Sequence, residues 1–310
     1  MIKIISESND VSTNEVIEYL IAYNVDFKRE NSDTFSNYSY TISNDLYDNE
    51  NPVIWHRRSV QQLNPVDLMN YSFSYHLWNE NDVVNKFYEK LNKQDKKYIG
   101  GFIEENQHNK LYDLHLAKLC GFKIPETLIT NKKTDLVNFK KRFESIITKP
   151  FKDLIKFKDN NSVYSSQGTF IVKDHHIKEL DEYFAVSKFQ EYIEKELEIR
   201  VFCFDKRIFA MAIFSQNDER TKVDFRNYNL EKESRNISFK LPNNIVSKIK
   251  KILKNKEINT CSIDLILTPD NEFVFLEINP QGQFGWVSKN CNYYVEKYIA
   301  ETLINYERNS

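Results

Sequence analysis

Two carboxylates and an amide stand in an otherwise apolar stretch near the end of this 310-residue chain: Asp264, Glu277 and Asn279. Such a group needs a compensating cation, because like charges withdrawn from water repel each other and are poorly solvated. Carboxylate and amide oxygens are hard ligands that suit Mg²⁺, which usually completes its shell with water and substrate phosphates. These residue types therefore predict a magnesium site that handles phosphate. The alternative is a surface hairpin whose acids are solvated.

A β-hairpin must bring these three side chains together. Residues 262–267 and 272–278 are rich in apolar and β-branched residues, and the Pro-Asp-Asn between them favours a turn. Glu277 and Asn279 are two residues apart and so share a strand face. Antiparallel pairing across the turn can place Asp264 on that same face.

Basic side chains stand at the ends of other predicted elements. Lys110 lies at the start of a helix that runs to Cys120 and is closed by Gly121. Lys149 follows an apolar strand and precedes Pro150, which has no amide hydrogen and should end that strand. Taken alone, each lysine could equally be a solvated surface residue.

Arginines mark two further strands. Arg200 shares a face with Glu198 in a strand that is otherwise apolar, where a buried guanidinium needs a partner. Arg57 and Arg58 follow an apolar strand over residues 52–55. Strand ends of open α/β sheets face ligand crevices, and arginine binds carboxylate or phosphate, so we expect both to contact substrate. The alternatives are a structural salt bridge from Arg200 to Glu198 and a basic surface pair.

Residues 161–170 predict a loop that covers phosphate. Ser165 and Ser166 are small hydroxyl residues, and Gly168 allows close approach of backbone amides to an anion. A plain hairpin turn is the alternative for this segment.

Composition excludes several other classes of function. The formal net charge is −2, which gives no footprint for nucleic acid. The four cysteines are scattered without CxxC pairing, as expected for reduced thiols in the cytoplasm. No apolar run approaches the roughly 18 residues that cross a membrane. We therefore expect a cytoplasmic protein that binds neither nucleic acid nor membrane.

The order of these motifs, from Asn109 to Gly285, resembles that of the ATP-grasp ligases. The strand end over residues 189–194 and the run Asp224-Phe225-Arg226 belong to the same pattern. Within that superfamily the chain resembles the maturases of ribosomal ω-ester peptides, the graspetide or microviridin-type ligases, and among them the grasp-with-spasm branch.

This resemblance implies an α/β ATP-grasp fold. It implies an N-terminal α/β domain over residues 1–108, a central domain over residues 109–188 and a C-terminal domain over residues 189–310, with the nucleotide between the last two. The strand-helix-strand pattern that opens the sequence agrees with an α/β N-terminal domain.

The resemblance also implies ATP and two Mg²⁺ ions as cofactors, with the metal held by Asp264, Glu277 and Asn279. Four consecutive residues would face the adenine: Gln190, Glu191, Tyr192 and Ile193. Glu198 would bind the ribose.

The remaining implied roles concern phosphate and the reacting groups. Lys110 and Lys149 would contact the phosphates, beneath the loop that contains Ser165, Ser166 and Gly168. Arg200 and Arg226 would face an acyl phosphate, and Asp224 is a candidate general base.

The implied reaction joins two side chains of a ribosomal precursor peptide, which has a leader and a core. An Asp or Glu carboxylate would be phosphorylated by ATP, and a Ser or Thr hydroxyl, or a Lys amine, would then close a macrocycle. A homodimer is also expected. The alternatives are a ligase of the glutamate-adding type, which joins free amino acids to an amine, and a non-catalytic module that binds nucleotide or peptide.

Overall fold

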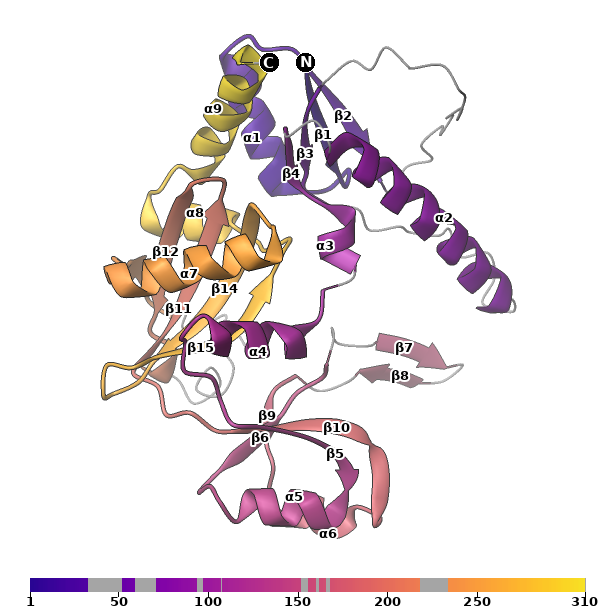
Figure 1. Cartoon of the computed structure of the whole chain (residues 1–310), viewed down its shortest axis with the longest axis vertical. Helices are drawn as coiled ribbons and strands as arrows, with labels where there is room; N and C mark the ends of the chain where they lie inside the picture. Colours follow the sequence, from indigo (N-terminus) through magenta and orange to yellow (C-terminus); the bar gives the residue numbers. More distant parts are fainter. Residues whose placement is uncertain are drawn as a thin grey trace.

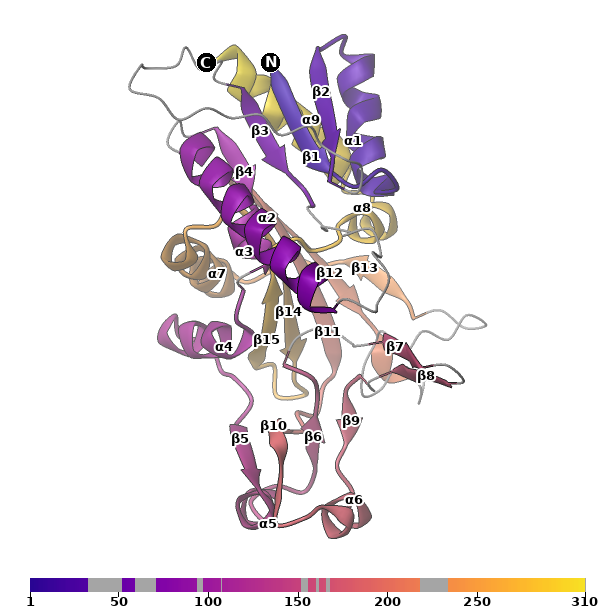
Figure 2. The same ribbon diagram turned by 90° about the vertical axis from the view of Figure 1, so that its right-hand side faces the viewer.

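The computed structural model describes residues 1–32, 52–58, 71–93, 97–106, 108–151, 156–159, 162–165, 168–217 and 234–309. Three main β-sheets follow one another along the long axis of the molecule (Figure 1). Both termini lie at the end formed by the first sheet, and the second sheet lies at the opposite end (Figure 2).

The first sheet is parallel and has the strand order β2-β1-β3-β4. Its strands are β1 (Ile2–Ser6), β2 (Phe27–Asn31), β3 (Val53–His56) and β4 (Tyr98–Gly100). The helices of this region are α1 (Val11–Ala22), α2 (Tyr71–Asn92) and α3 (Phe102–Asn106). The parallel order agrees with the α/β character expected for the N-terminal region.

The second sheet has the order β5-β10-β6-β9 and packs on two short helices. Its strands are β5 (Thr127–Lys132), β6 (Ile146–Thr148), β9 (Phe170–Ile171) and β10 (Tyr183–Glu191). The helices are α5 (Lys133–Lys140) and α6 (Asp174–Glu179), and a separate hairpin pairs β7 (Lys156–Asp159) with β8 (Ser162–Ser165). A small apolar core fills the space between sheet and helices.

The third sheet is antiparallel, with the order β13-β12-β11-β14-β15. Its strands are β11 (Leu197–Phe204), β12 (Arg207–Ile213), β13 (Asn236–Ser238), β14 (Thr260–Leu267) and β15 (Phe273–Asn279). Two helices, α4 (Lys110–Leu119) and α7 (Asn243–Lys256), cover one face, which is turned to the viewer in Figure 1. The other face shares a core with the first sheet and with α8 (Gly285–Cys291) and α9 (Val295–Arg308).

The alternation of side chains along β11 explains where polar groups can collect. Val201 and Cys203 enter the core beneath α4 and α7, whereas Phe202 and Phe204 enter the opposite core. Glu198 and Arg200 continue the face of the two phenylalanines, because strand side chains repeat every second residue. The aromatic face of β11 therefore becomes polar toward the beginning of the strand.

The hairpins predicted from the sequence are present. The turn between β11 and β12 contains Asp205 at φ +50°, and Gly121 follows α4 at φ +89°. Among the described helices, none is both long enough and apolar enough to cross a membrane. The domain boundaries expected after residues 108 and 188 stay predictions.

Candidate active site

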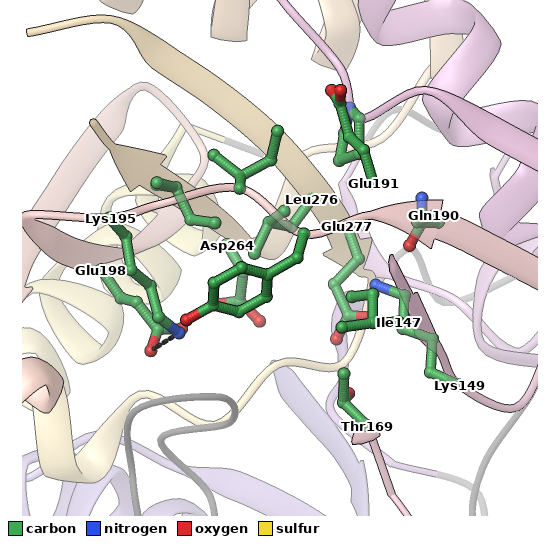
Figure 3. A pocket seen from close by; sticks show the side chains of 14 residues that line it. Ile147, Lys149, Thr169, Gln190, Glu191, Lys195, Glu198, Asp264, Leu276 and Glu277 are labelled. Carbon is green, nitrogen blue, oxygen red and sulfur yellow. Dashed lines mark hydrogen bonds and ion pairs between the residues drawn. The ribbon is translucent and has the colours of Figure 1, made fainter. Parts of the chain in front are cut away.

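A pocket lies between the second and third sheets (Figure 3). It has about 630 Å³ of free space, counted with the open space at its mouth. One wall comes from the second sheet, the other from the third sheet, and the chain between β10 and β11 joins them. The lining residues are Pro125, Ile147, Lys149, Thr169, Gln190, Glu191, Tyr192, Ile193, Lys195, Glu198, Asp264, Ile266, Leu276 and Glu277.

Two of the three predicted metal ligands lie directly opposite each other in this pocket. Asp264 on β14 and Glu277 on β15 are register partners, and each is only 8% exposed. A β-bulge follows Asp264 in the pairing of the two strands. Asn279 lies close by, since its Nδ2 donates to Glu277 Oε1 over 3.4 Å. The hairpin therefore brings the three side chains together, as the alternation of residues predicts.

Two cations face the two acids. Arg200, the register partner of Asp264 on β11, donates from Nη1 to Asp264 Oδ1 (2.7 Å) and Oδ2 (2.9 Å). Its guanidinium carbon lies 5.9 Å from the Trp286 ring centroid. Lys110 Nζ is 3.6 Å from Glu277 Oε2. The salt bridge expected for Arg200 thus involves Asp264, whereas Glu198 has a different partner.

Lys110 is held near Glu277 by the start of its helix. The side chain of Asn109 accepts hydrogen bonds from the amides of Leu111 and Tyr112, which caps α4. Because α4 packs on the third sheet, this capped first turn presents Lys110 to the end of β15. The sequence signal for Lys110 was its position directly after the capping asparagine.

Glu198 belongs to a buried group of three polar side chains. Its Oε1 accepts from Lys195 Nζ at 2.7 Å and from Ser215 Oγ at 2.8 Å. Burial raises the pKa of the Glu198 carboxyl, and the Lys195 ammonium partly opposes this. Lys195 was not identified from the sequence, although its spacing of three residues from Glu198 could have indicated the pair. The ribose-binding role of Glu198 stays a prediction.

The predicted adenine-facing residues form the link between the two walls. Gln190 is almost fully buried and donates from Nε2 to Thr127 Oγ1 at 2.9 Å. The Glu191 carboxylate accepts from the backbone amide of Glu126 at 3.1 Å. Tyr192 and Ile193 line the pocket without a predicted polar role. In Figure 3 the Glu191 carboxylate lies apart from the Asp264 and Glu277 carboxylates.

Only some of the residues predicted to lie near phosphate are found at the pocket. Lys149 lines the pocket from the end of β6, and Thr169, directly after Gly168, lines it beside Lys149. Ser165 ends strand β8, so at this residue the expected loop is a strand. Ser166, Asp224 and Arg226 lie outside the described residues. The roles proposed for these three stay predictions.

Arg57 and Arg58 lie away from this pocket, on the loop that follows β3. Arg57 is 3% exposed and donates to the Gln281 carbonyl (2.9 Å) and to Gln283 Oε1 (3.1 Å). Burial lowers its pKa to about 10. Arg58 lies 3.6 Å from Glu7 Oε2 and is more exposed. Arg57 thus joins the first sheet to the segment that follows β15, and a substrate contact by either arginine stays a prediction.

The donor set fits a hard divalent cation. Two nearly buried carboxylates and a neighbouring amide supply oxygen ligands of the kind that Mg²⁺ prefers. In the part of the chain that the structure describes, no group of three or more His, Cys, Asp or Glu side chains could hold a metal. A site with two carboxylates and an asparagine agrees with that finding, because its third ligand is an amide.

Solved structures that are similar to this chain include ATP-grasp ligases. A ligase from Chryseobacterium gregarium, associated with ribosomal peptides and solved with ADP and a leader and core peptide, superposes with a TM-score of 0.80 at 23% identity, covering 98% of this chain and 97% of that one. The macrocyclase MdnC from Microcystis aeruginosa MRC, bound with its precursor peptide MdnA, gives 0.78 at 26% identity, covering 98% and 99%. The ligase PsnB with minimal precursor, Mg and ADP gives 0.76 at 16% identity, covering 98% and 96%.

These likenesses extend over nearly the whole chain. They confirm the predicted ATP-grasp fold and the predicted resemblance to ligases of peptide maturation. No protein-family model matches the sequence, and no curated protein matches it.

Proposed function

We propose that this protein is an ATP-dependent ligase that matures a ribosomal precursor peptide. It phosphorylates Asp or Glu side chains of the peptide and couples them to Ser or Thr hydroxyls, or to a Lys amine, which closes macrocyclic ω-esters or ω-amides. Support comes from structures of the same fold that were solved with ADP and with precursor peptides.

One observation carries this proposal: a single pocket contains both an acid pair and a separate polar link between two sheets. Asp264 and Glu277 face each other at one end, each with a cation beside it. Gln190 lines the same pocket, on the strand that leads into the link. A nucleotide can span such a pocket with its base at the link and its phosphates at the acids.

The chemistry follows from the charges at the acid end. A carboxylate is a poor acyl donor because its leaving group would be oxide, and phosphorylation supplies a better leaving group. Mg²⁺ held by Asp264, Glu277 and Asn279 would neutralise charge on the phosphate oxygens when bound. Lys110 and Lys149 bind further phosphate oxygens, and Arg200 orients the transferred phosphate on the peptide carboxylate.

The remaining parts of the proposal rest on the sequence alone. They are two Mg²⁺ ions per site, docking of both leader and core peptide, Arg226 at the acyl phosphate, and a homodimer in the cytoplasm that binds neither nucleic acid nor membrane. Light scattering of the purified protein tests the dimer, and Mg²⁺ titration in the presence of ADP counts the ions.

Mass spectrometry of a peptide substrate tests the activity. The protein is incubated with ATP, Mg²⁺ and a candidate precursor encoded beside its gene, and ADP release is followed in parallel. Each ring formed removes one water from the peptide, whereas a ligase of the glutamate-adding type would add a glutamyl residue. ADP release with an unchanged peptide mass, across all neighbouring candidates, would reject the macrocyclase. Absence of ATP binding would reject every ligase.

A further inference from the structure

Lys188 on β10 is a buried lysine that the proposed mechanism does not yet use. Its exposed fraction is 2%, and its Nζ donates to the Pro150 carbonyl at 3.2 Å and lies 5.7 Å from the Phe151 ring centroid. Among the described residues, no carboxylate lies within ion-pairing distance of this ammonium group. Buried lysines normally have an anionic partner, since an unpaired charge in such a place is poorly solvated.

Strand pairing places Lys188 on the pocket side of the second sheet. Gln190, two residues further along β10, lines the pocket, so Lys188 shares its face. Phe189, between them, points into the core against α5 and α6. β10 pairs with β6 through Phe189 and Thr148, which sets Lys188 across from Lys149 at the next position of this register.

Two lysines at opposed positions of neighbouring strands repel each other. Burial, followed by the charge of Lys149, lowers the pKa of Lys188 to about 7. Lys110 lowers it further, and Glu277 acts in the opposite direction. The charged groups that act on Lys188 are thus two lysines of the proposed phosphate site and one carboxylate of the proposed metal site.

We propose that Lys188 is a third phosphate-binding lysine of this site, which exchanges the Pro150 carbonyl for a phosphate oxygen of the bound nucleotide. The inference rests on the proposed function, because it assumes that ATP occupies this pocket. A polyphosphate supplies the anionic partner that Lys188 does not have among the described residues. The Lys188 ammonium is then ion-paired in the complex, and its repulsion from Lys149 is screened by the phosphate between them.

Two consequences follow for nucleotide binding. Loss of the Lys188 ammonium group should lower the affinity for ligands that have phosphates and leave the affinity for ligands without phosphates unchanged. Binding of ADP should also be accompanied by proton uptake, since an anion beside Lys188 favours its charged form. Because burial and the charge of Lys149 lower the pKa of Lys188 to about 7, uptake at Lys188 should be larger at pH 8 than at pH 7.

Isothermal titration calorimetry of the full chain tests the first consequence. In the presence of Mg²⁺, Lys188→Met should lower the affinity for ADP by about tenfold or more and leave the affinity for adenosine unchanged. Lys188→Arg, which keeps the charge, should recover part of the affinity for ADP. Lys133→Met is the matched control, because Lys133 in the same region also donates to backbone carbonyls, those of Lys178 and Leu180, and is remote from the pocket lining.

The second consequence is measured on the wild-type protein, so it does not depend on whether a variant folds. Titration of ADP in two buffers of different ionisation enthalpy gives the number of protons taken up. Equal loss of ADP and adenosine affinity in Lys188→Met would show that Lys188 only supports the fold, and unchanged ADP affinity would show that it does not reach phosphate. Failure of the wild type to bind ATP or ADP would reject the proposed function itself, whereas normal wild-type binding without proton uptake rejects the role of Lys188 alone.

Discussion

Replacing Arg200 by methionine should separate the structural contact of Asp264 from its proposed role as a metal ligand. The two side chains are register partners on β11 and β14, and one guanidinium nitrogen reaches both carboxylate oxygens, at 2.7 and 2.9 Å. Both side chains are largely withdrawn from water. Methionine keeps much of the length of the side chain but removes its charge.

The loss of stability expected for Arg200→Met is larger without Mg²⁺ than with it. A hydrogen bond to a charged group contributes about 1.5–3 kcal/mol, so the free energy of unfolding should fall by about 2 kcal/mol when Asp264 loses its partner. A divalent cation bound by Asp264 supplies the missing positive charge. Mg²⁺ should therefore stabilise Arg200→Met more than it stabilises the wild type, and the difference between the two proteins should narrow as Mg²⁺ is added.

Urea denaturation with and without Mg²⁺, followed by circular dichroism, measures both quantities. Lys123→Met is the control, because Lys123, before β5, and Glu272, in the turn before β15, form an ion pair that is about half exposed. The free energy of unfolding of Lys123→Met should fall by less than about 1 kcal/mol, independently of Mg²⁺. Equal stabilisation of Arg200→Met and wild type by Mg²⁺ would refute Asp264 as a metal ligand. A variant as stable as wild type in the absence of Mg²⁺ would refute the magnitude assigned to the ion pair.

Three further predictions concern the acids and the arginines. Glu277→Gln should keep the fold but lower ADP release by about 100-fold or more, since it removes a charged ligand of the proposed metal, and near-normal turnover would contradict that assignment. Burial raises the pKa of the Glu198 carboxyl, so the free energy of unfolding should fall as the pH rises above 4.5. Glu198→Gln should make this fall smaller. Urea denaturation at several pH values measures it, and an equal fall in the variant and the wild type would contradict this effect of Glu198. Arg57→Met should lower the free energy of unfolding by about 3–5 kcal/mol, because it breaks a buried ion pair with Asp10 in addition to two hydrogen bonds. Arg58→Met should change it by less than about 1 kcal/mol, and similar losses would contradict the different burial of the two arginines.

The acid pair could be predicted because both strands and the turn between them lie in one short segment of the sequence. Asp264 and Glu277 interrupt two apolar strands that are joined by a turn, so the pairing partner of each strand is its neighbour in the chain. Alternation then determines the face of each acid. The same reasoning applied to β11 placed Arg200 in a buried strand with an acidic partner. Glu198, which is local, was the partner in the structural alternative, whereas strand pairing supplied Asp264 from β14.

The partners of the cations depend on contacts between sheets, which no local pattern contains. Arg57 follows an apolar strand like many substrate-binding arginines, and only the loop after β15 shows that its guanidinium is already bonded to Gln281 and Gln283. Lys188 lies two residues before the predicted adenine-facing residues, which begin at Gln190, and its neighbours in the sequence are typical of a surface lysine. Its burial arises because β10 pairs with β6, a strand from an earlier part of the chain, and so sets it across from Lys149. A phosphate-binding function is therefore better inferred from the opposed positions of Lys149 and Lys188 than from either lysine alone.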